Sequence, residues 1–396
     1  MRVMGSCDEY TRGVLSLDWS SHCKFAVNRA ANVQSACFLE HALRVCVTSF
    51  STLVKRVLIL ASLNKMTMPS AIIFLIFFLL RHGHGQLQLN YYAETCPDAE
   101  QIVEDEVGKL HHKHYNNAIP WIRNLFHDCI VKSCDASLLL QTRSKDGIIG
   151  EEESPRSVGL RGFKFVNEIK EVLERECPGT VSCADVMALA ARDAVALLGG
   201  PRVAMRTGRR DGTQSYYSVV EDYIPNNNDS LPLVLSRFES IGIDTEGVVA
   251  LLGAHSVGRV HCVNLVDRLY PTTDPTMDPD LASYLQGRCP MPGEETEHVE
   301  YARNDRVTPF LLDNMYYNHL LAHRGLMQVD QQLTENTTTL GFVERFASDN
   351  GYFHEQFGKN FLILSENNPL TGEAGEIRAD CRHVNEMHSL GENTIS

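Results

Sequence analysis

Segments in which apolar and polar residues alternate are nearly absent from this chain of 396 residues. Because a period of two is the pattern of a half-buried strand, this scarcity argues against a fold built on β-sheets. The chain also lacks internal repeats and low-complexity linkers, and its composition does not change between residues 86 and 390. These absences indicate that residues 86–390 form a single domain, long enough to bury a sizeable core.

The N-terminal region has no apolar run long enough to cross a membrane as a helix, which takes about 20 residues. The run at residues 71–80 follows Met66 and Met68 and precedes small residues, which is the layout of a signal peptide. We therefore expect a signal peptide at residues 66–85 and a C-terminal tail at 391–396. We interpret residues 1–65 as disordered or as the product of an over-extended start. If Met1 is the start, the apolar run would instead be an internal targeting signal.

Basic residues are outnumbered, because 36 Lys and Arg stand against 50 Asp and Glu. The resulting formal net charge of −14 does not suit a protein that holds nucleic acid through its phosphates, so we expect no nucleic-acid partner. The apolar share of 43% and the charged share of 22% are those of an ordinary globular protein.

Paired CxxC motifs are also missing, which weakens the interpretation of the cysteines as a zinc site or as free thiols. Eight of the 12 cysteines follow Gln86, and an even number behind a signal peptide predicts four disulfide bonds in an oxidising compartment. Eight cysteines allow 105 pairings, and their spacing does not choose among them. The triplets that begin at Asn228 and Asn336 are glycosylation sequons, which fit secretion.

The dominant hydrophobic period is helical. Asp98 and Ser182 are expected to cap helices, and Gly199-Gly200-Pro201 ends the second of these. Long loops are expected at residues 225–232 and 271–280, where Pro is combined with Asn or Asp. We predict an all-α domain with helices at residues 98–110, 118–126, 163–174, 182–197, 245–257 and 308–321.

One stretch, residues 121–137, concentrates groups that can carry chemistry. Arg123 and His127 are four residues apart, so they share one face of a helix, although such a pair is more often solvated than catalytic. The neighbouring Trp121, Leu125 and Phe126 indicate burial. Asp128, Asp135 and Ser137 offer the hard oxygens that calcium prefers, and a polar turn rigidified by a disulfide is an equal alternative.

His255 ends an apolar stripe that runs along the predicted helix 245–257. A histidine in that position is either a satisfied core residue or the axial ligand of a buried haem. An axial histidine usually needs a carboxylate on its other nitrogen, and Asp330 is a candidate. Asp305, Thr308 and Asp313 repeat the acid–hydroxyl–acid pattern, which is weak evidence by itself.

These residues, taken together, resemble one known family, the secreted plant haem peroxidases of class III. The resemblance extends from Gln86 to about Asn385, and residues 249–265 resemble the peroxidase 21-like branch. Its motifs occur in the family's order and spacing: RNLFHDC at 123–129, CDAS at 134–137, TVSCAD at 180–185, GRRD at 208–211, GAHS at 253–256 and DNMYY at 313–317.

The resemblance implies a two-lobed helical fold with minimal β-structure and one haem b between a distal and a proximal lobe. By position, His127 would be the distal acid–base group and Arg123 its electrostatic partner. His255 would be the iron ligand, held by Asp330, and Phe126 would contact the cofactor. Pro225 would lie where aromatic donors dock.

The resemblance further implies two calcium ions and a disulfide pattern. The distal ion would take Asp128, the carbonyls of Val131 and Ser133, Asp135, Ser137 and, at an alignment that can slip by one residue, Glu151. The proximal ion would take Ser256, Asp305, Thr308, a carbonyl near Leu311, and Asp313. The implied disulfides are Cys96–Cys177, Cys129–Cys134, Cys183–Cys381 and Cys262–Cys289.

Three positions depart from the family pattern. Arg156 stands where an Asn usually orients the distal histidine, and Asn304 stands where an apolar residue often packs beneath the proximal histidine. Ser133 replaces a usual Gly, which is tolerable because only its carbonyl would bind. These departures bear on rate and donor preference more than on the type of reaction.

The implied function is a secreted peroxidase (EC 1.11.1.7) that reduces hydrogen peroxide and oxidises phenolic donors in one-electron steps. Such an enzyme would act in the cell wall or apoplast, or in the vacuole, in peroxide removal, oxidative stress and lignin chemistry. We expect a monomer without stable membrane association. One alternative is a haem- or calcium-bound wall protein with little turnover, and another is an intracellular peroxidase of the ascorbate type, which eight cysteines and the signal-like run disfavour.

Overall fold

The computed structural model describes residues 86–141, 150–291 and 301–385, and all of these described residues belong to one compact unit. The expected extension, signal peptide and C-terminal tail (1–65, 66–85 and 391–396) lie outside the described residues. Among the described helices, none has both the length and the apolar character needed to cross a membrane.

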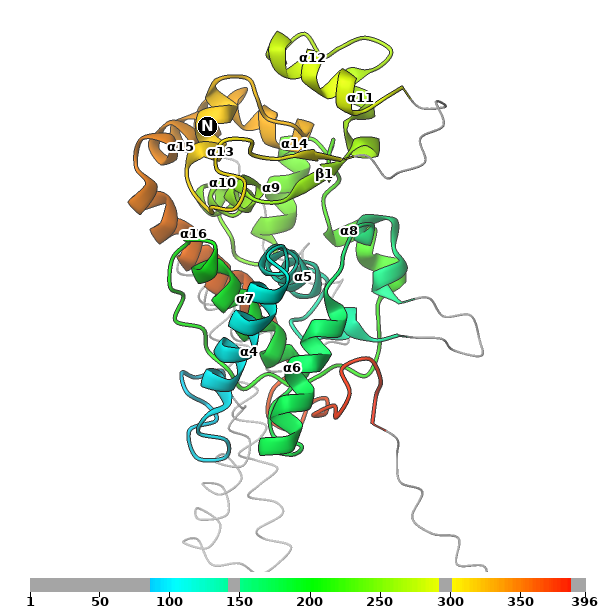
Figure 1. Cartoon of the computed structure of the whole chain (residues 1–396), viewed down its shortest axis with the longest axis vertical. Helices are drawn as coiled ribbons and strands as arrows, with labels where there is room; N and C mark the ends of the chain where they lie inside the picture. Colours follow the sequence, from blue (N-terminus) through cyan, green and yellow to red (C-terminus); the bar gives the residue numbers. More distant parts are fainter. Residues whose placement is uncertain (1–85, 142–149, 292–300, 386–396) are drawn as a thin grey trace, which may run out of the picture. The chain divides into compact units, whose positions relative to one another are not determined.

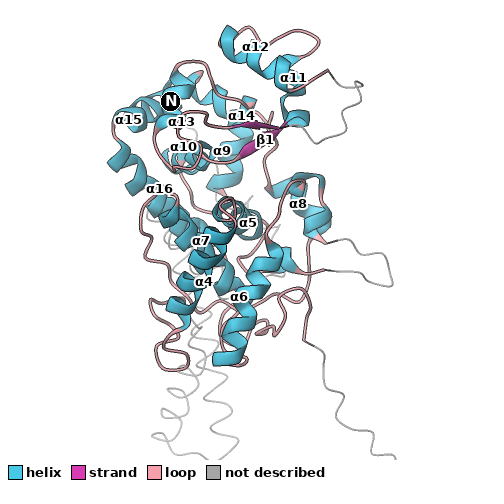
Figure 2. Cartoon of the chain, in the orientation of Figure 1, coloured by secondary structure: helices cyan, strands magenta, loops and turns pink. Residues whose placement is uncertain are grey.

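The described chain is mostly helical, which confirms the predicted fold class (Figure 2). Its one two-stranded antiparallel sheet pairs β1 (Arg259–His261) with β2 (Tyr301–Arg303). The helices are α4 (Ala99–Lys113), α5 (Ala118–Ile130), α6 (Phe163–Glu176), α7 (Cys183–Leu197), α8 (Val220–Tyr223), α9 (Leu231–Glu239), α10 (Thr245–Leu252), α11 (Val266–Leu269), α12 (Pro279–Arg288), α13 (Met315–Leu321), α14 (Gln328–Gln331), α15 (Thr337–Ser348) and α16 (Asn350–Ser365).

The helices gather in two groups with α5 between them (Figure 1). On one side α4, α6 and α7 pack together, and on the other side α10 packs against α15 and α16. Helix α5 contacts both groups through α7 and α16. It can do so because Trp121, Leu125 and Ile130 are fully buried, so apolar side chains anchor the helix that carries Arg123 and His127.

Side-chain hydrogen bonds to the backbone decide several helix ends. The Ser182 hydroxyl accepts from the Asp185 amide at 3.1 Å and caps α7 as predicted. Asp98 occupies the N-cap position of α4 as predicted, but its side chain makes no capping hydrogen bond.

Two predicted helices are shorter than expected. The expected helix at 308–321 begins only at Met315, whose amide binds the Asp313 carboxylate at 3.0 Å. Such local bonds compete with the helical ladder. The expected helix at 245–257 ends at Leu252 and continues as a 3₁₀ turn, Gly253–Ser256.

The described part of the chain has four disulfide bonds: Cys96–Cys177, Cys129–Cys134, Cys183–Cys381 and Cys262–Cys289. These are the pairs that the resemblance implies. Two of them close long loops of 81 and 198 residues, and such cross-links stabilise the folded state mainly by restricting the unfolded chain.

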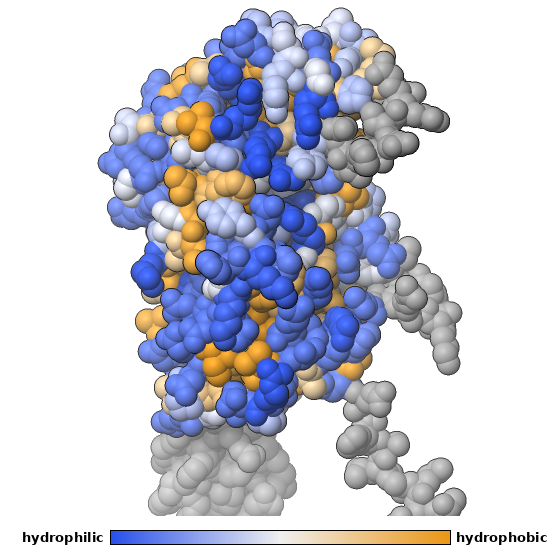
Figure 3. All heavy atoms as spheres, in the orientation of Figure 1, coloured by the Kyte–Doolittle hydropathy of each residue, from blue (hydrophilic) through white to orange (hydrophobic). Residues whose placement is uncertain are grey.

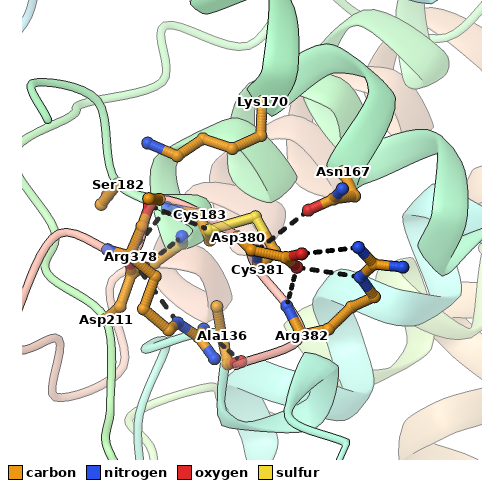
Figure 4. The surroundings of a disulfide bond; sticks show 12 residues. Ala136, Asn167, Lys170, Ser182, Cys183, Asp211, Arg378, Asp380, Cys381 and Arg382 are labelled. Carbon is orange, nitrogen blue, oxygen red and sulfur yellow. Dashed lines mark hydrogen bonds and ion pairs between the residues drawn. A yellow bond between two sulfur atoms is a disulfide. The ribbon is translucent and has the colours of Figure 1, made fainter. Parts of the chain in front are cut away.

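The C-terminal segment, which comprises residues 366–385 after α16, is held in place beside the Cys183–Cys381 bond (Figure 4). The buried Asp211 carboxylate accepts hydrogen bonds from the amides of Cys183 and Arg378, at 3.1 and 2.9 Å. The Arg378 guanidinium donates from Nη2 to the Ala136 carbonyl at 2.7 Å. The C-terminal segment is thereby bound to the loop that follows α5 and carries the predicted distal calcium ligands.

Buried apolar side chains form one large cluster and a smaller one. The smaller cluster consists of residues from β1, β2, α11, α12 and the loops beside them. On the face shown in Figure 3, polar side chains cover most of the surface and apolar ones form small patches.

Replacing Arg209 by methionine should strongly destabilise the fold. Arg209 and Asp185 form an ion pair at 2.8 Å in which neither side chain is exposed. Losing the arginine leaves a buried carboxylate without its cation, at a cost of about 3–5 kcal/mol in the free energy of unfolding. Urea denaturation measures this. The matched change in the exposed Arg382–Asp380 pair should cost less than about 1 kcal/mol, and equal effects of the two substitutions would contradict the interpretation.

Candidate active site

Helix α5 presents Arg123 and His127 one turn apart. The His127 side chain is buried, with 3% of its surface exposed. The Arg123 side chain is exposed to solvent, although enough protein atoms lie around its guanidinium to lower its pKa. Its guanidinium donates to the carbonyls of Val158 and Arg156, at 3.2 and 3.3 Å. These two bonds fix the guanidinium against the segment that precedes α6.

The electrostatics of this pair suit a neutral base beside a permanent cation. Burial, together with the charge of Arg123, lowers the pKa of His127 well below its usual value. Burial lowers the pKa of Arg123 to about 10, so the guanidinium stays charged at neutral pH. An imidazole that is uncharged at pH 7 can accept a proton from a bound substrate.

The orientation of His127 bears on the departure at position 156. Its buried Nδ1 atom has no hydrogen-bond partner within the described segments, and neither has the buried Nε of Arg156. The Arg156 carbonyl binds Arg123 instead. The residue at the usual asparagine position thus holds the arginine of the pair and not the histidine.

A second histidine is held by a carboxylate. His255 lies in the 3₁₀ turn after α10, and its Nδ1 is 2.8 Å from Asp330 Oδ1. The same oxygen accepts from the Tyr316 hydroxyl at 2.9 Å. A carboxylate on Nδ1 fixes the tautomer and leaves Nε2 as the nitrogen available to a ligand. The His255 side chain is 34% exposed, whereas that of Asp330 is 4% exposed.

The turn that carries His255 requires a glycine at its start. A Cβ atom at Gly253 would lie 2.5 Å from both the Tyr317 hydroxyl and the Phe353 ring. The backbone before His255 can therefore approach α13 and α16 only without a side chain.

The segment after His255 meets the α5 side of the molecule. A Cβ atom at Gly159 would lie 2.9 Å from His261 Nε2 and 3.6 Å from Arg123 Nη1. One at Gly258 would lie 3.3 Å from Ile119, in the first turn of α5. The two histidine sites thus belong to adjoining segments, although no hydrogen bond between described residues joins His127 to His255.

The departure at position 304 has a visible consequence. The Asn304 amide donates from Nδ2 to the Val257 carbonyl at 3.0 Å, and its buried Oδ1 has no partner within the described residues. The Asn304 amide therefore forms a hydrogen bond with the backbone two residues after His255. An apolar side chain at position 304 could make van der Waals contacts there but no hydrogen bond.

A cluster of buried oxygens follows α5. Both Asp128 oxygens accept from amides, those of Ala136 at 3.0 Å and Leu138 at 3.2 Å. Glu151 Oε1 accepts from the Tyr216 amide at 2.9 Å. In contrast, Glu151 Oε2 and the Ser137 hydroxyl are buried without a hydrogen-bond partner among the described residues. Unsatisfied buried oxygens of this kind suit a cation.

The carboxylates of this cluster repel one another. Burial and the charges of Asp135 and Glu151 raise the pKa of Asp128 well above its usual value. Burial raises the pKa of Glu151 to about 7. A divalent cation would reverse these shifts, because it favours the ionised forms. The structure therefore brings Glu151 to the same cluster as Asp128 and Asp135.

The two carbonyl positions lie in the turn between Asp128 and Asp135. The Val131 carbonyl accepts from the Ser133 amide at 2.8 Å. The Ser133 hydroxyl donates to the Asn368 carbonyl at 3.0 Å, so the side chain is directed to the C-terminal segment. Only the main chain of Ser133 remains for a role at the oxygen cluster.

A second oxygen cluster lies before α13. The Thr308 hydroxyl is 3.1 Å from Asp305 Oδ2 and 3.2 Å from Asp313 Oδ1. The Ser256 hydroxyl is fully buried, and within the described ranges it has no partner. The Leu311 amide binds the Thr308 carbonyl at 3.0 Å, which closes the turn between them.

A histidine also contacts this second cluster, and the sequence analysis did not foresee it. His319 Nε2 is 3.3 Å from Asp305 Oδ1. Burial would raise the pKa of Asp305, but bonds from His319 and the amides of Thr308 and Val307 outweigh it, so the pKa is lowered.

Neither cluster is a cage of acidic side chains alone. Over the described ranges, no three His, Cys, Asp or Glu side chains converge as a metal site. An ion would therefore need hydroxyl and carbonyl oxygens as well, which is the mixed set that calcium accepts.

The loop that carries Pro225 is tied to the His255 side of the molecule. The Asn227 side chain donates to the Asn264 carbonyl at 2.7 Å, and the Val329 amide donates to the Asn227 carbonyl at 2.9 Å. Pro225 itself is partly exposed, between α8 and α9. Phe126, the other predicted contact residue, stacks on Phe238 of α9 with ring centroids 5.9 Å apart.

Sequence reasoning missed several residues that complete these sites. Tyr316 was noted only as part of a motif, and nothing in its spacing signals the bond to Asp330. Ser215 and Tyr216, which both bind Glu151, and Asn368, which binds Ser133, lie far along the chain from these partners. A pattern of local spacing cannot detect such partners.

Comparison with known proteins agrees with this geometry. The peroxidase family model matches residues 103–349. The chain is 57% identical to Peroxidase 21 of Arabidopsis thaliana over 311 residues, which cover 78% of this chain and 94% of that protein. It is 50% identical to Peroxidase 42 of the same plant over 302 residues, 76% of this chain and 91% of the relative. The predicted resemblance to the peroxidase 21 branch is confirmed.

The matched region contains the Arg123–His127 pair, the His255–Asp330 pair and both oxygen clusters. Members of this family bind haem and calcium and contain disulfide bonds. The chain belongs to the class III family of plant haem peroxidases, enzymes that oxidise donor molecules with hydrogen peroxide.

Proposed function

We propose that the chain binds one haem b through His255 Nε2 and uses it to oxidise small phenols with hydrogen peroxide. The observation that carries this proposal is the 2.8 Å contact between His255 and Asp330. A carboxylate on Nδ1 makes the imidazole a stronger electron donor, as an axial ligand requires. Phe126 is proposed to contact the cofactor.

We further propose one calcium ion in each oxygen cluster. The ion beside α5 would take Asp128, Asp135, Ser137, Glu151 and the carbonyls of Val131 and Ser133. The other would take Ser256, Asp305, Thr308, Asp313 and the carbonyl near Leu311. The unpartnered Ser137 and Ser256 hydroxyls and Glu151 Oε2 support both assignments.

The acid–base work falls to α5. Haem, when bound, supplies the redox chemistry that reduces peroxide and stores its oxidising equivalents. Neutral His127 takes a proton from one peroxide oxygen and delivers it to the other, which leaves as water. Arg123 stabilises the negative charge that develops on the leaving oxygen, because its own charge persists at neutral pH.

The chain's own contacts keep this geometry fixed. Arg123 is held by two carbonyls, and Asp128 anchors the loop that follows α5. Position matters because a shift of about 1 Å can cost on the order of a hundredfold in rate. Pro225, in a partly exposed loop tied to the His255 side, is proposed as the place where phenols dock.

The setting of the enzyme is also a proposal. The four disulfide bonds suit an oxidising compartment, so we propose secretion to the cell wall or apoplast, with the vacuole as a second destination. We propose a monomer whose partners are hydrogen peroxide and small phenols, with neither nucleic acid nor stable membrane contact. In this setting the domain begins at Gln86, after removal of residues 66–85.

Loading the purified protein with haem tests the proposal. The loaded protein should show the absorption of ferric high-spin haem and should oxidise guaiacol only when hydrogen peroxide is added. Replacing His255 by alanine should abolish tight haem binding in a spectroscopic titration, because the axial nitrogen that Asp330 positions is lost. The control His112→Ala removes an exposed histidine and should change nothing. Haem-loaded protein that oxidises no phenol would overturn the proposal.

A further inference from the structure

A series of aromatic rings runs from the His255 site to the protein surface. Its members lie on α13, α15 and α16, which pack against one another (Figure 1). The His255 and Tyr316 ring centroids are 6.4 Å apart, and Tyr317 follows Tyr316 at 5.0 Å. Phe346 follows Tyr317 at 5.2 Å, and Tyr352 follows Phe346 at 5.6 Å. Tyr317 and Phe346 are fully buried, whereas Tyr352 is partly exposed.

The last ring is equipped to lose a proton. The Tyr352 hydroxyl donates to Glu246 Oε1 at 2.6 Å, and this carboxylate lies in the first turn of α10. The Arg345 guanidinium covers the Tyr352 ring at 3.6 Å. A positive charge on this ring is therefore disfavoured, so removal of an electron must be accompanied by removal of the phenolic proton.

The inner tyrosines are less suited to hold an oxidised state. The Tyr317 hydroxyl donates hydrogen bonds to the carbonyls of Val249 and Ala250. These neutral carbonyls are too weakly basic to take the phenolic proton away from the tyrosine. The Tyr316 hydroxyl donates to Asp330, whose oxygen also binds His255, so a proton placed there would weaken the bond that holds the histidine. Within the described residues, the Glu246 side chain makes no hydrogen bond to the His255 site, so its protonation leaves that site intact. An oxidised state that enters the series should therefore settle on Tyr352.

We propose that Tyr352 is a second oxidation site, at which phenols attached to large polymers are oxidised without docking at the Pro225 loop. The proposal rests on the proposed function, because it needs the oxidising equivalents that the haem held by His255 would take from peroxide. The Tyr352 side chain is partly exposed and lies on α16, outside the Pro225 loop between α8 and α9, so a polymer-bound phenol can reach it without docking at that loop.

The electrons and protons balance as follows. One electron leaves Tyr352 along the ring series. This electron uses up one of the two oxidising equivalents that hydrogen peroxide supplies. The O–H bond of Tyr352 breaks, its proton passes to Glu246, and a neutral tyrosyl radical remains. A donor phenol then returns one electron and one proton to Tyr352 and becomes a phenoxyl radical, while Glu246 releases its proton. Two such cycles consume one hydrogen peroxide and two phenols and yield two waters and two phenoxyl radicals.

Trapping locates the radical directly. Haem-loaded protein is mixed with hydrogen peroxide and a nitroso spin trap, without any donor, and the adduct is mapped by peptide mass spectrometry. We expect the adduct on Tyr352 and its loss in Tyr352→Phe, which keeps the ring and removes the hydroxyl. Tyr115→Phe is the matched control, because Tyr115 is 60% exposed and lies outside the series. A Tyr352 without adduct would overturn the proposal.

Donor size provides the functional test. The same phenol is offered free and attached by a short linker to dextran. Tyr352→Phe should lower the rate with the dextran-bound phenol at least about tenfold and leave the rate with the free phenol unchanged. Glu246→Gln should act in the same direction, because the loss of a positioned base costs about tenfold or more.

The outcomes separate the two proposals. Equal losses, or no loss, for both forms of the phenol in Tyr352→Phe would overturn this inference and leave the proposed function standing. Failure of the unmodified protein to oxidise free phenol would overturn both.

Discussion

Replacing His127 by alanine should slow the reaction of the haem-loaded protein with hydrogen peroxide by about 10²–10⁴-fold, the usual contribution of a positioned acid–base group. The expectation follows from burial and from the neighbouring Arg123, both of which lower the pKa of His127 and keep it neutral. Haem binding should be unchanged, because the proposed ligand is His255. Stopped-flow mixing with peroxide measures the rate, and absorption spectra measure haem content.

A control variant and a variant of the partner residue accompany this experiment. His112→Ala removes an exposed histidine of α4 and should react as the unmodified protein does. Arg123→Met should also slow the peroxide reaction, by about 10²–10³-fold, because a charge placed at the leaving oxygen is lost. A His127→Ala protein that reacts with peroxide at the normal rate would remove the basis for the proposed acid–base role.

Calcium removal should destabilise the protein more at pH 7 than at pH 4.5. Without the ion, burial raises the pKa of Glu151 from 4.5 to about 7. A carboxyl with a raised pKa in the folded state favours folding below its unfolded pKa, and this contribution is lost as the pH rises through the folded pKa. The calcium-free protein should thus lose on the order of 3 kcal/mol of unfolding free energy between these two pH values.

Urea denaturation with and without a chelator, at both pH values, measures this loss. Glu151→Gln should reduce the pH dependence of the chelated protein, because one of the carboxyls with a raised pKa is gone. Glu153→Gln changes an exposed neighbour and should retain it. A chelated protein that is equally stable at both pH values would contradict the proposed calcium ligation by Glu151.

Much of the fold could be predicted from helical periodicity, because α5, α6 and α7 have regular apolar faces that periodicity detects. The predicted helices at 245–257 and 308–321 were too long. Periodicity does not register that the Asp313 side chain binds the Met315 amide, or that the chain tightens into a 3₁₀ turn before His255. The two strands, three residues each, are too short to produce a pattern.

The candidate site was predicted less from spacing than from motifs. Arg123 and His127 are neighbours on a helix, so their proximity could be deduced. The contact between His255 and Asp330 joins residues 75 apart, and that between Glu151 and Tyr216 joins residues 65 apart. Only tertiary packing creates such contacts. The family resemblance supplied the first of these pairs, and neither spacing nor resemblance supplied the second.

The single-turnover rate with hydrogen peroxide, followed from pH 4 to pH 8, tests the central claim most directly. If neutral His127 is the proton acceptor, the rate should stay constant from pH 8 to below 6.5, the ordinary pKa of histidine, and fall only in more acidic solution. In His127→Ala the rate should be at least about a hundredfold lower and should lack this fall. A variant with the pH profile and the rate of the unmodified protein would contradict the claim that α5 carries the peroxide-cleaving pair.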